Sequence, residues 1–151
     1  MQKTVIYMTN VENAISLFKK GFRCSQAILS AYATQFGLDQ ELALRLASPF
    51  GGGMGSLGNT CGAVTGAIMV LGLKYGHSKV GELKKKEKAN QITKDFVEKF
   101  KSRNGSIMCK ELLNCDISTP EGRNKAIEEK LFIEICPNLV RDSAEILEEL
   151  L

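Results

Sequence analysis

Cysteine is the residue type in this sequence that offers the clearest chemistry. Four of the five cysteines stand at or near predicted helix starts: Cys24, Cys61, Cys109 and Cys136. Backbone N–H groups and the helix macrodipole stabilise an anion there, so a thiol at such a position can have its pKa lowered toward neutral pH. The resulting thiolate attacks disulfides and binds metals. Cys115 has no helix start beside it and is interpreted as a buried structural residue.

Cys61 is the strongest of these candidates because it follows a glycine-rich loop. Residues 51–62 hold six of the chain's fourteen glycines, and glycine lets backbone approach a neighbouring group closely. The loop therefore either packs its backbone against Cys61 or lets a small substrate reach the sulfur. No Walker pattern follows, and the dinucleotide-like Gly53, Gly55 and Gly58 come after a predicted helix rather than a strand. The sequence thus argues against a nucleotide site.

Small residues continue into the helix that follows this loop. Gly62 and Gly66 lie one helical turn apart and predict a flat face that another helix can approach closely, with Gly72 as an extension of it. A homodimer is one arrangement that this face and the apolar C-terminal helix would suit.

Three interpretations of the cysteines remain open at this stage. In the first, Cys61 is a nucleophile of low pKa and one of Cys24, Cys109 or Cys136 is the resolving thiol, as in a thiol-dependent oxidoreductase. Its partner would be a redox protein, a small-molecule thiol or another electron donor. Another interpretation is a non-catalytic helical interaction domain in which the cysteines fill the core.

The remaining interpretation is a metal centre. Four thiolates from Cys24, Cys61, Cys109 and Cys136 match a tetrahedral sulfur site for zinc or an iron–sulfur cluster. No Cys-x-x-Cys pair is present, so such a site would have to be assembled from separate helices. His77, the only histidine, is interpreted as an exposed loop residue rather than a ligand.

Length and composition limit the function classes. The chain has 151 residues, of which 44% are hydrophobic and 25% charged, and this predicts one globular domain over residues 1–151. A net charge of +3 is too small to indicate nucleic-acid binding, and the lysine run at 84–88 is interpreted as a solvated helix face. The N-terminus lacks a signal-peptide pattern, and no apolar stretch reaches about 18 residues. We expect a cytoplasmic protein without a membrane partner, where structural disulfides are uncommon.

Helical patterns dominate the chain and predict an all-α fold. A Thr9-to-Glu12 capping box begins the first helix. Apolar spacing and helix-ending Gly or Pro then predict helices near 10–20, 24–36, 40–48, 61–75, 79–101, 107–113, 120–136 and 138–151. Residues 4–7 are the one strand candidate, and a single strand cannot make a sheet. We therefore expect a compact multi-helix bundle of about seven to eight helices.

These motifs together resemble a known family. The segments at 21–27, 51–55, 61–66 and 109–112, with the late Cys136, are similar to the C-GCAxxG-C-C family of redox-active proteins, over about residues 14–147. In this chain Thr60 precedes Cys61 and Gly62 follows it, which is the Cys-Gly-Ala-x-x-Gly form of the central motif. The resemblance implies a thiol-based redox or metal role for Cys24, Cys61, Cys109 and Cys136. It leaves Cys115 outside the pattern and implies no substrate.

Overall fold

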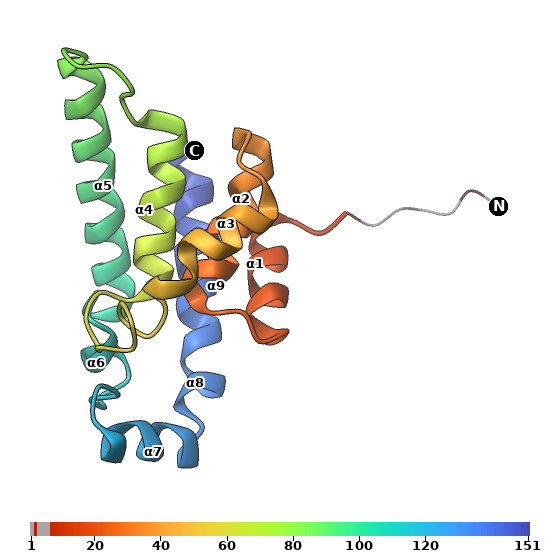
Figure 1. Ribbon diagram of the computed structural model, residues 1–151, viewed down its shortest axis with the longest axis vertical. Coiled ribbons are helices and arrows are strands. Elements are labelled where there is room, and N and C mark those ends of the chain that lie inside the picture. Colours follow the sequence, from red (N-terminus) through yellow and green to blue (C-terminus); the bar gives the residue numbers. More distant parts are fainter. Residues whose placement is uncertain (1, 3–6) are drawn as a thin grey trace.

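The structure, a computed structural model, describes residue 2 and residues 7–151, which form nine α-helices and two short 3-10 segments (Figure 1). In chain order these elements are α1 (Asn10–Lys19), α2 (Cys24–Ala33), η1 (Thr34–Phe36), α3 (Gln40–Ala47), η2 (Ser48–Phe50), α4 (Gly62–Tyr75), α5 (Leu83–Asn104), α6 (Cys109–Leu112), α7 (Pro120–Glu128), α8 (Leu131–Glu134) and α9 (Cys136–Leu150). Within the described part of the chain, the only β pairing is one bridge between Thr60 and Met108. The all-α prediction is confirmed.

Local capping explains where the first helix begins. The Thr9 hydroxyl accepts a hydrogen bond from the Glu12 N–H at 3.1 Å, and the Glu12 carboxylate accepts one from the Thr9 N–H at 2.9 Å. These reciprocal bonds satisfy N–H groups that a helix start leaves without partners. The capping-box prediction is therefore correct.

The predicted helix over 120–136 is wrong in its length. Lys130 adopts a left-handed backbone with φ of 57°, which ends α7 and separates it from the single turn of α8. Cys136 then begins α9, and Pro137 occupies the first turn of that helix. Proline suits this position because the first N–H groups of a helix have no intrahelical acceptor. The strand candidate at residues 4–7 lies outside the described residues, apart from the exposed Tyr7.

Helices α2 and α4 occupy the centre of the main hydrophobic core. Eight of the ten residues of α2 and seven of the fourteen residues of α4 are buried, and helices that are apolar on most sides belong in an interior. The buried hydroxyl groups in this region have partners. Ser25 donates to the Ala47 carbonyl at 2.8 Å, and Ser143 of α9 donates to the Ala63 carbonyl at 2.6 Å.

Two glycines allow α4 to lie directly against α2. A Cβ added at Gly62 would stand 2.5 Å from the Cys24 sulfur, and one at Gly66 would stand 2.8 Å from the Ser25 carbonyl oxygen. Both distances are too short for a side chain, so the predicted flat face is real and its neighbour is α2. No atom would lie within 4 Å of a Cβ at Gly72, which therefore does not extend the face. Because α2 fills this face, it is not free for a homodimer.

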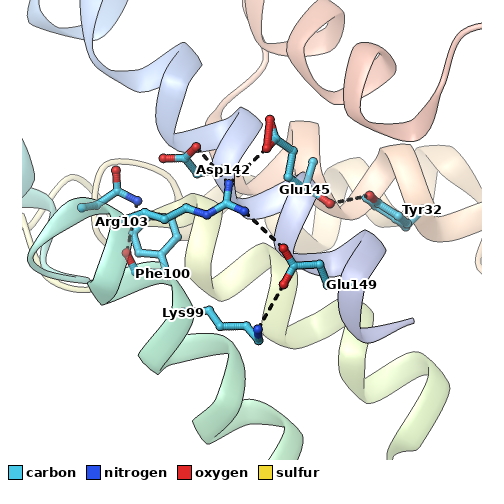
Figure 2. A network of polar contacts seen from close by, with 9 residues as sticks. Tyr32, Lys99, Phe100, Arg103, Asp142, Glu145 and Glu149 are labelled. Atoms are coloured by element: carbon cyan, nitrogen blue, oxygen red, sulfur yellow. Dashed lines mark hydrogen bonds and ion pairs between the residues drawn. The ribbon is translucent and has the colours of Figure 1, made fainter.

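Helix α5 is fixed to α9 by packing on one side and by charges on the other. Phe96 and Phe100 are fully buried. At the surface, Arg103 reaches three carboxylates of α9, at 3.4 Å, 3.1 Å and 3.3 Å (Figure 2): Asp142, Glu145 and Glu149. Lys99 adds a fourth ion pair, to Glu149 at 3.1 Å. Burial of the phenylalanines supplies most of the stabilisation, since exposed ion pairs contribute at most about 1 kcal/mol each.

The segment from α6 to α8 forms a second, smaller hydrophobic cluster. Figure 1 shows α7 lying across the end of the molecule below α6 and α8. Ala126 of α7 is fully buried there, beside Leu113 and Ile117. Partly buried Phe132 and Cys136 pack against the same cluster. This arrangement brings the start of α9 near α6, although 26 residues separate Cys109 from Cys136.

None of the described helices combines the length and the low polarity needed to cross a membrane. The lysines of residues 84–88 lie exposed on α5, as the sequence predicts.

The α2–α4 contact predicts opposite effects for two glycine substitutions in the same helix. Gly66→Ala should lower the free energy of unfolding by about 1–3 kcal/mol, because its Cβ would meet the Ser25 carbonyl oxygen. Gly72→Ala, whose Cβ meets nothing, should raise it by about 0.5–1 kcal/mol through helix propensity. Urea unfolding followed by circular dichroism measures both. Equal stability of the two variants would contradict the described packing.

Candidate functional site

Each of the four candidate cysteines lies at a helix start, as the sequence predicts. Cys24, Cys109 and Cys136 are the first residues of α2, α6 and α9, and Cys61 is the N-cap residue of α4. All are free thiols. Cys115 lies after α6 and donates its S–H to the Gly122 carbonyl at 3.0 Å, which gives it a local structural partner.

The approach of α4 to α2 places the Cys24 sulfur beside Gly62 and close enough to Cys61 for the two thiols to shift each other's pKa. Gly62 is necessary for this approach, because a Cβ there would occupy the space of the Cys24 sulfur. Cys24 is half-buried, whereas the side chain of Cys61 is only 4% exposed. Cys24 is therefore the more exposed residue of the pair.

Cys109 is placed near this pair by hydrogen bonds between two extended segments. The Cys61 N–H donates to the Ile107 carbonyl at 2.7 Å, and the Cys109 N–H donates to the Asn59 carbonyl at 2.6 Å. These bonds surround the bridge between Thr60 and Met108. They fix the start of α6 beside the start of α4, so the two cysteines lie at adjacent helix starts.

All four candidate cysteines line one cavity of about 700 Å³. This volume lies within the range of small-molecule sites. The cavity is enclosed by the end of α1, the starts of α2, α4 and α9, the glycine-rich loop, and the segment from α6 to α8. Cys115 is not among the lining residues. The convergence of four thiols from four separate helices on one space is the main structural feature of the site.

The glycine-rich loop winds through left-handed backbone next to this cavity. Five consecutive residues, 52–56, have φ between 59° and 75°, a region that costs little only for glycine. Figure 1 shows the loop in yellow, beside α6 and the start of α4. A Cβ at Gly53 would collide with the Asn59 backbone. The Gly52 N–H helps to lower the pKa of Cys24, whereas the sequence analysis expected the loop either to pack against Cys61 or to admit a small substrate to its sulfur.

Arg23 is a site residue that the sequence analysis missed. It precedes Cys24, and its guanidinium donates to the Ser48 carbonyl at 3.2 Å and to the Ser56 hydroxyl at 2.6 Å. Its side chain occupies the space beside Gly51 that a Cβ would need. Arg23 therefore clamps the loop and places a positive charge near Cys24. In the sequence, the signal for this role is an arginine directly before a cysteine that begins a helix.

The surroundings of Cys24 and Cys61 differ, and they favour Cys24 as the thiolate. The Cys61 thiol, the Gly52 and Ser25 N–H groups and the Arg23 charge together outweigh burial and lower the pKa of Cys24 to about 6. The pKa of Cys61 is raised well above its ordinary value, first because it donates to Cys24 and second because it is buried. These surroundings favour Cys24 over Cys61 as the thiolate of the pair, so the role of Cys61 as the thiol of low pKa stays a prediction.

A helix start does not lower the pKa of the other two cysteines. Burial is the largest cause that raises the pKa of Cys109 and of Cys136 to about 12, and the negative charge of Cys24 adds to the effect. Desolvation disfavours a thiolate, and at these two positions it outweighs the field of the helix. At neutral pH the cavity thus holds one thiolate and three protonated thiols.

The described residues show no preformed ligand set for zinc or an iron–sulfur cluster. Four sulfurs share the cavity, yet the described side chains contain no group of three or more Cys, His, Asp or Glu arranged to hold a metal ion. A tetrahedral sulfur site needs all its ligands at about 2.3 Å from the metal. His77 is exposed in the loop after α4. The geometry favours a pair of thiols in contact over a ligand set.

Comparison with known proteins agrees with the motif pattern. A family model described as "Putative redox-active protein (C_GCAxxG_C_C)" matches residues 22–150. The matched range contains all five cysteines and the glycine-rich loop. Searches of curated proteins and of solved structures returned no match.

The site geometry predicts that Cys24 reacts first with an alkylating agent. With the reduced protein, the rate of Cys24 modification by iodoacetamide should rise with pH through a midpoint near 6, because the thiolate is the reacting form. Cys109 and Cys136 should react only at far higher pH. Peptide mass spectrometry assigns each site. Titration of Cys24 at the ordinary thiol value would contradict this electrostatic description.

Substitution of Cys61 separates the causes of the lowered pKa. Cys61→Ala removes the largest stabilising contact of the Cys24 thiolate, so the midpoint for Cys24 should move upward. Cys61→Ser keeps a hydroxyl donor and should stay closer to the wild type. If both variants retain the wild-type midpoint, the contact between the two sulfurs does not control the pKa.

Proposed function

The chain belongs to the C_GCAxxG_C_C family, and we propose that it exchanges thiols and disulfides through Cys24 and Cys61. One observation carries the proposal: a partly exposed thiol of lowered pKa stands beside a buried, protonated thiol, and both line one cavity. Exchange requires an attacking sulfur that is both anionic and accessible, and a second thiol within reach of it. Cys24 meets the first requirement and Cys61 meets the second.

In the first step the Cys24 thiolate attacks one sulfur of a substrate disulfide, R–S–S–R′. A bond forms between Cys24 and the R sulfur, the substrate S–S bond breaks, and R′–S⁻ leaves. The Gly52 and Ser25 N–H groups and Arg23 hold the thiolate in place before the attack.

In the second step Cys61 resolves the mixed disulfide. Its proton passes to R′–S⁻, and its sulfur attacks the Cys24 sulfur to form the Cys24–Cys61 disulfide, while R–S⁻ leaves. The dithiol loses two electrons and the substrate gains them. Two external thiols, either the dithiol of a redox partner protein or two molecules of a small thiol, restore the dithiol by the reverse sequence and leave as a disulfide.

Cys109 and Cys136 take no part in the first exchange in this proposal. Both are protonated at neutral pH, and neither has the donors that surround Cys24. Both line the same cavity. Either thiol is therefore available to attack the Cys24–Cys61 disulfide in a later exchange step. The five free thiols also suit the cytoplasm, the reducing compartment that the sequence predicts.

Oxidation by an uncharged small disulfide tests the proposal. Treatment of the reduced protein with hydroxyethyl disulfide should yield one main product, a disulfide that joins tryptic peptides 24–45 and 46–74, found by non-reducing mass spectrometry. Cys61→Ser should stop at a mixed disulfide on Cys24, because the resolving thiol is gone. Cys24→Ser should react at least about tenfold more slowly at neutral pH, since a depressed thiol pKa gives the reactive anion.

Cys115→Ser is the matched control, because Cys115 lies outside the cavity. Its oxidation product and rate should equal those of the wild type. Metal content should be measured on the same anaerobic preparation. A stoichiometric metal released only by thiol modification, with no Cys24–Cys61 disulfide on oxidation, would overturn the proposal in favour of a metal centre.

A further inference from the structure

Apart from the Cys24 thiolate, the charged side chains that line the cavity are all positive. They are Lys19 at the end of α1, Arg23 before α2 and Arg123 on α7, and no carboxylate lines the cavity. Lys19 and Arg123 are exposed, which places them where the cavity meets solvent, while Arg23 is half-buried beside Cys24. Within the described part of the chain, none of the three forms an ion pair with a carboxylate.

The rest of the lining is largely apolar. Phe18 and Phe22 contribute from the α1–α2 side, and Phe132 from α8 faces the same space. Ile133 is also a lining residue, and its side chain is 71% exposed. An exposed isoleucine at the edge of an apolar cavity extends the surface that an apolar ligand could cover.

We propose that this cavity binds a small amphipathic anion, such as a carboxylate with an apolar body. Its charge lies with Lys19 and Arg123 at the opening, and its apolar part lies against the phenylalanines and extends toward Cys24. Among the described residues no carboxylate pairs with the two rim cations, so an anionic group can approach them, and covering the apolar lining releases water. That a disulfide carrying such an anionic, apolar group is the substrate of the thiol pair rests on the proposed function, whereas binding of the anion does not.

The proposal is tested by comparing the affinities of the reduced protein for ligands that differ in charge and in chain length. Isothermal titration calorimetry should give an affinity for decanoate about tenfold higher than for decanol or decyltrimethylammonium, because only decanoate complements the rim cations. Shortening to octanoate should weaken binding by about fourfold for each buried methylene. Equal affinity for the three decyl compounds would overturn the proposal and indicate a purely apolar occupant, such as a peptide segment of a partner.

Two substitutions on α7 test which positive side chain of this helix contributes to decanoate binding. Arg123→Gln should weaken decanoate binding by about two- to fivefold, as expected for an exposed ion pair. Lys125→Gln removes the same charge from the same helix but is not a lining residue, so it should leave the affinity unchanged. Equal loss in both variants would mean that only the general charge of the surface matters, which contradicts a defined site.

Protection of Cys24 places the ligand in the cavity. Saturating decanoate should slow the alkylation of Cys24 by neutral iodoacetamide, and binding without protection would overturn the assigned position. The two proposals can fail separately. If hydroxyethyl disulfide produces the Cys24–Cys61 disulfide but decanoate does not bind, only the ligand class is wrong. If decanoate binds and protects but no disulfide forms, the ligand class stands and the exchange reaction is wrong.

Discussion

The close contact between α2 and α4 at Gly62 is the constraint on which the rest of the site depends. It brings a helix-start cysteine from each helix to the same point, with no room for a side chain between them. The spacing of the Cys-Gly-Ala-x-x-Gly motif follows from this contact. Gly62 leaves space for the Cys24 sulfur, and Gly66, one turn later, lets the helices stay close along the next turn. The glycines of the motif thus act mainly through helix packing, which places the two helix-start cysteines side by side.

A helix start lowers the pKa of a thiol and burial raises it. Which of the two effects is larger differs among the four cysteines. All four cysteines occupy the end of a helix where an anion is stabilised, but only the pKa of Cys24 is lowered. The difference lies in additional donors. Cys24 has a neighbouring thiol, the N–H groups of Gly52 and Ser25, and the charge of Arg23, whereas burial dominates at Cys109 and Cys136. Position at a helix start is therefore not sufficient for a reactive thiolate.

The sequence predicted the elements of this site better than their roles. Apolar periodicity, the Thr9 cap and the helix-ending glycines depend on neighbours in the chain, so the helices and the four helix-start cysteines could be located. The identity of the thiolate depends first on the neighbouring Cys61 thiol and then on the Gly52 N–H, which belongs to a loop with left-handed backbone over 52–56. It depends equally on how deeply each sulfur is buried. Both are properties of the tertiary arrangement, which a single sequence does not display.

Charge balance connects the thiol pair to the cavity around it. At neutral pH the four thiols carry one negative charge, on Cys24, and Arg23 stands next to it. Arg23 is also held by the Ser48 carbonyl and the Ser56 hydroxyl, so it cannot leave the thiolate without releasing the loop. Lys19 and Arg123 then remain as charges that the thiolate does not offset, at the opening of a largely apolar space. An anionic molecule with an apolar body satisfies both parts of the lining, while a cationic one would be repelled at the entrance. Because Arg23 offsets the charge of the Cys24 thiolate, the charge that remains at the cavity opening is positive. This positive charge favours the approach of anionic ligands.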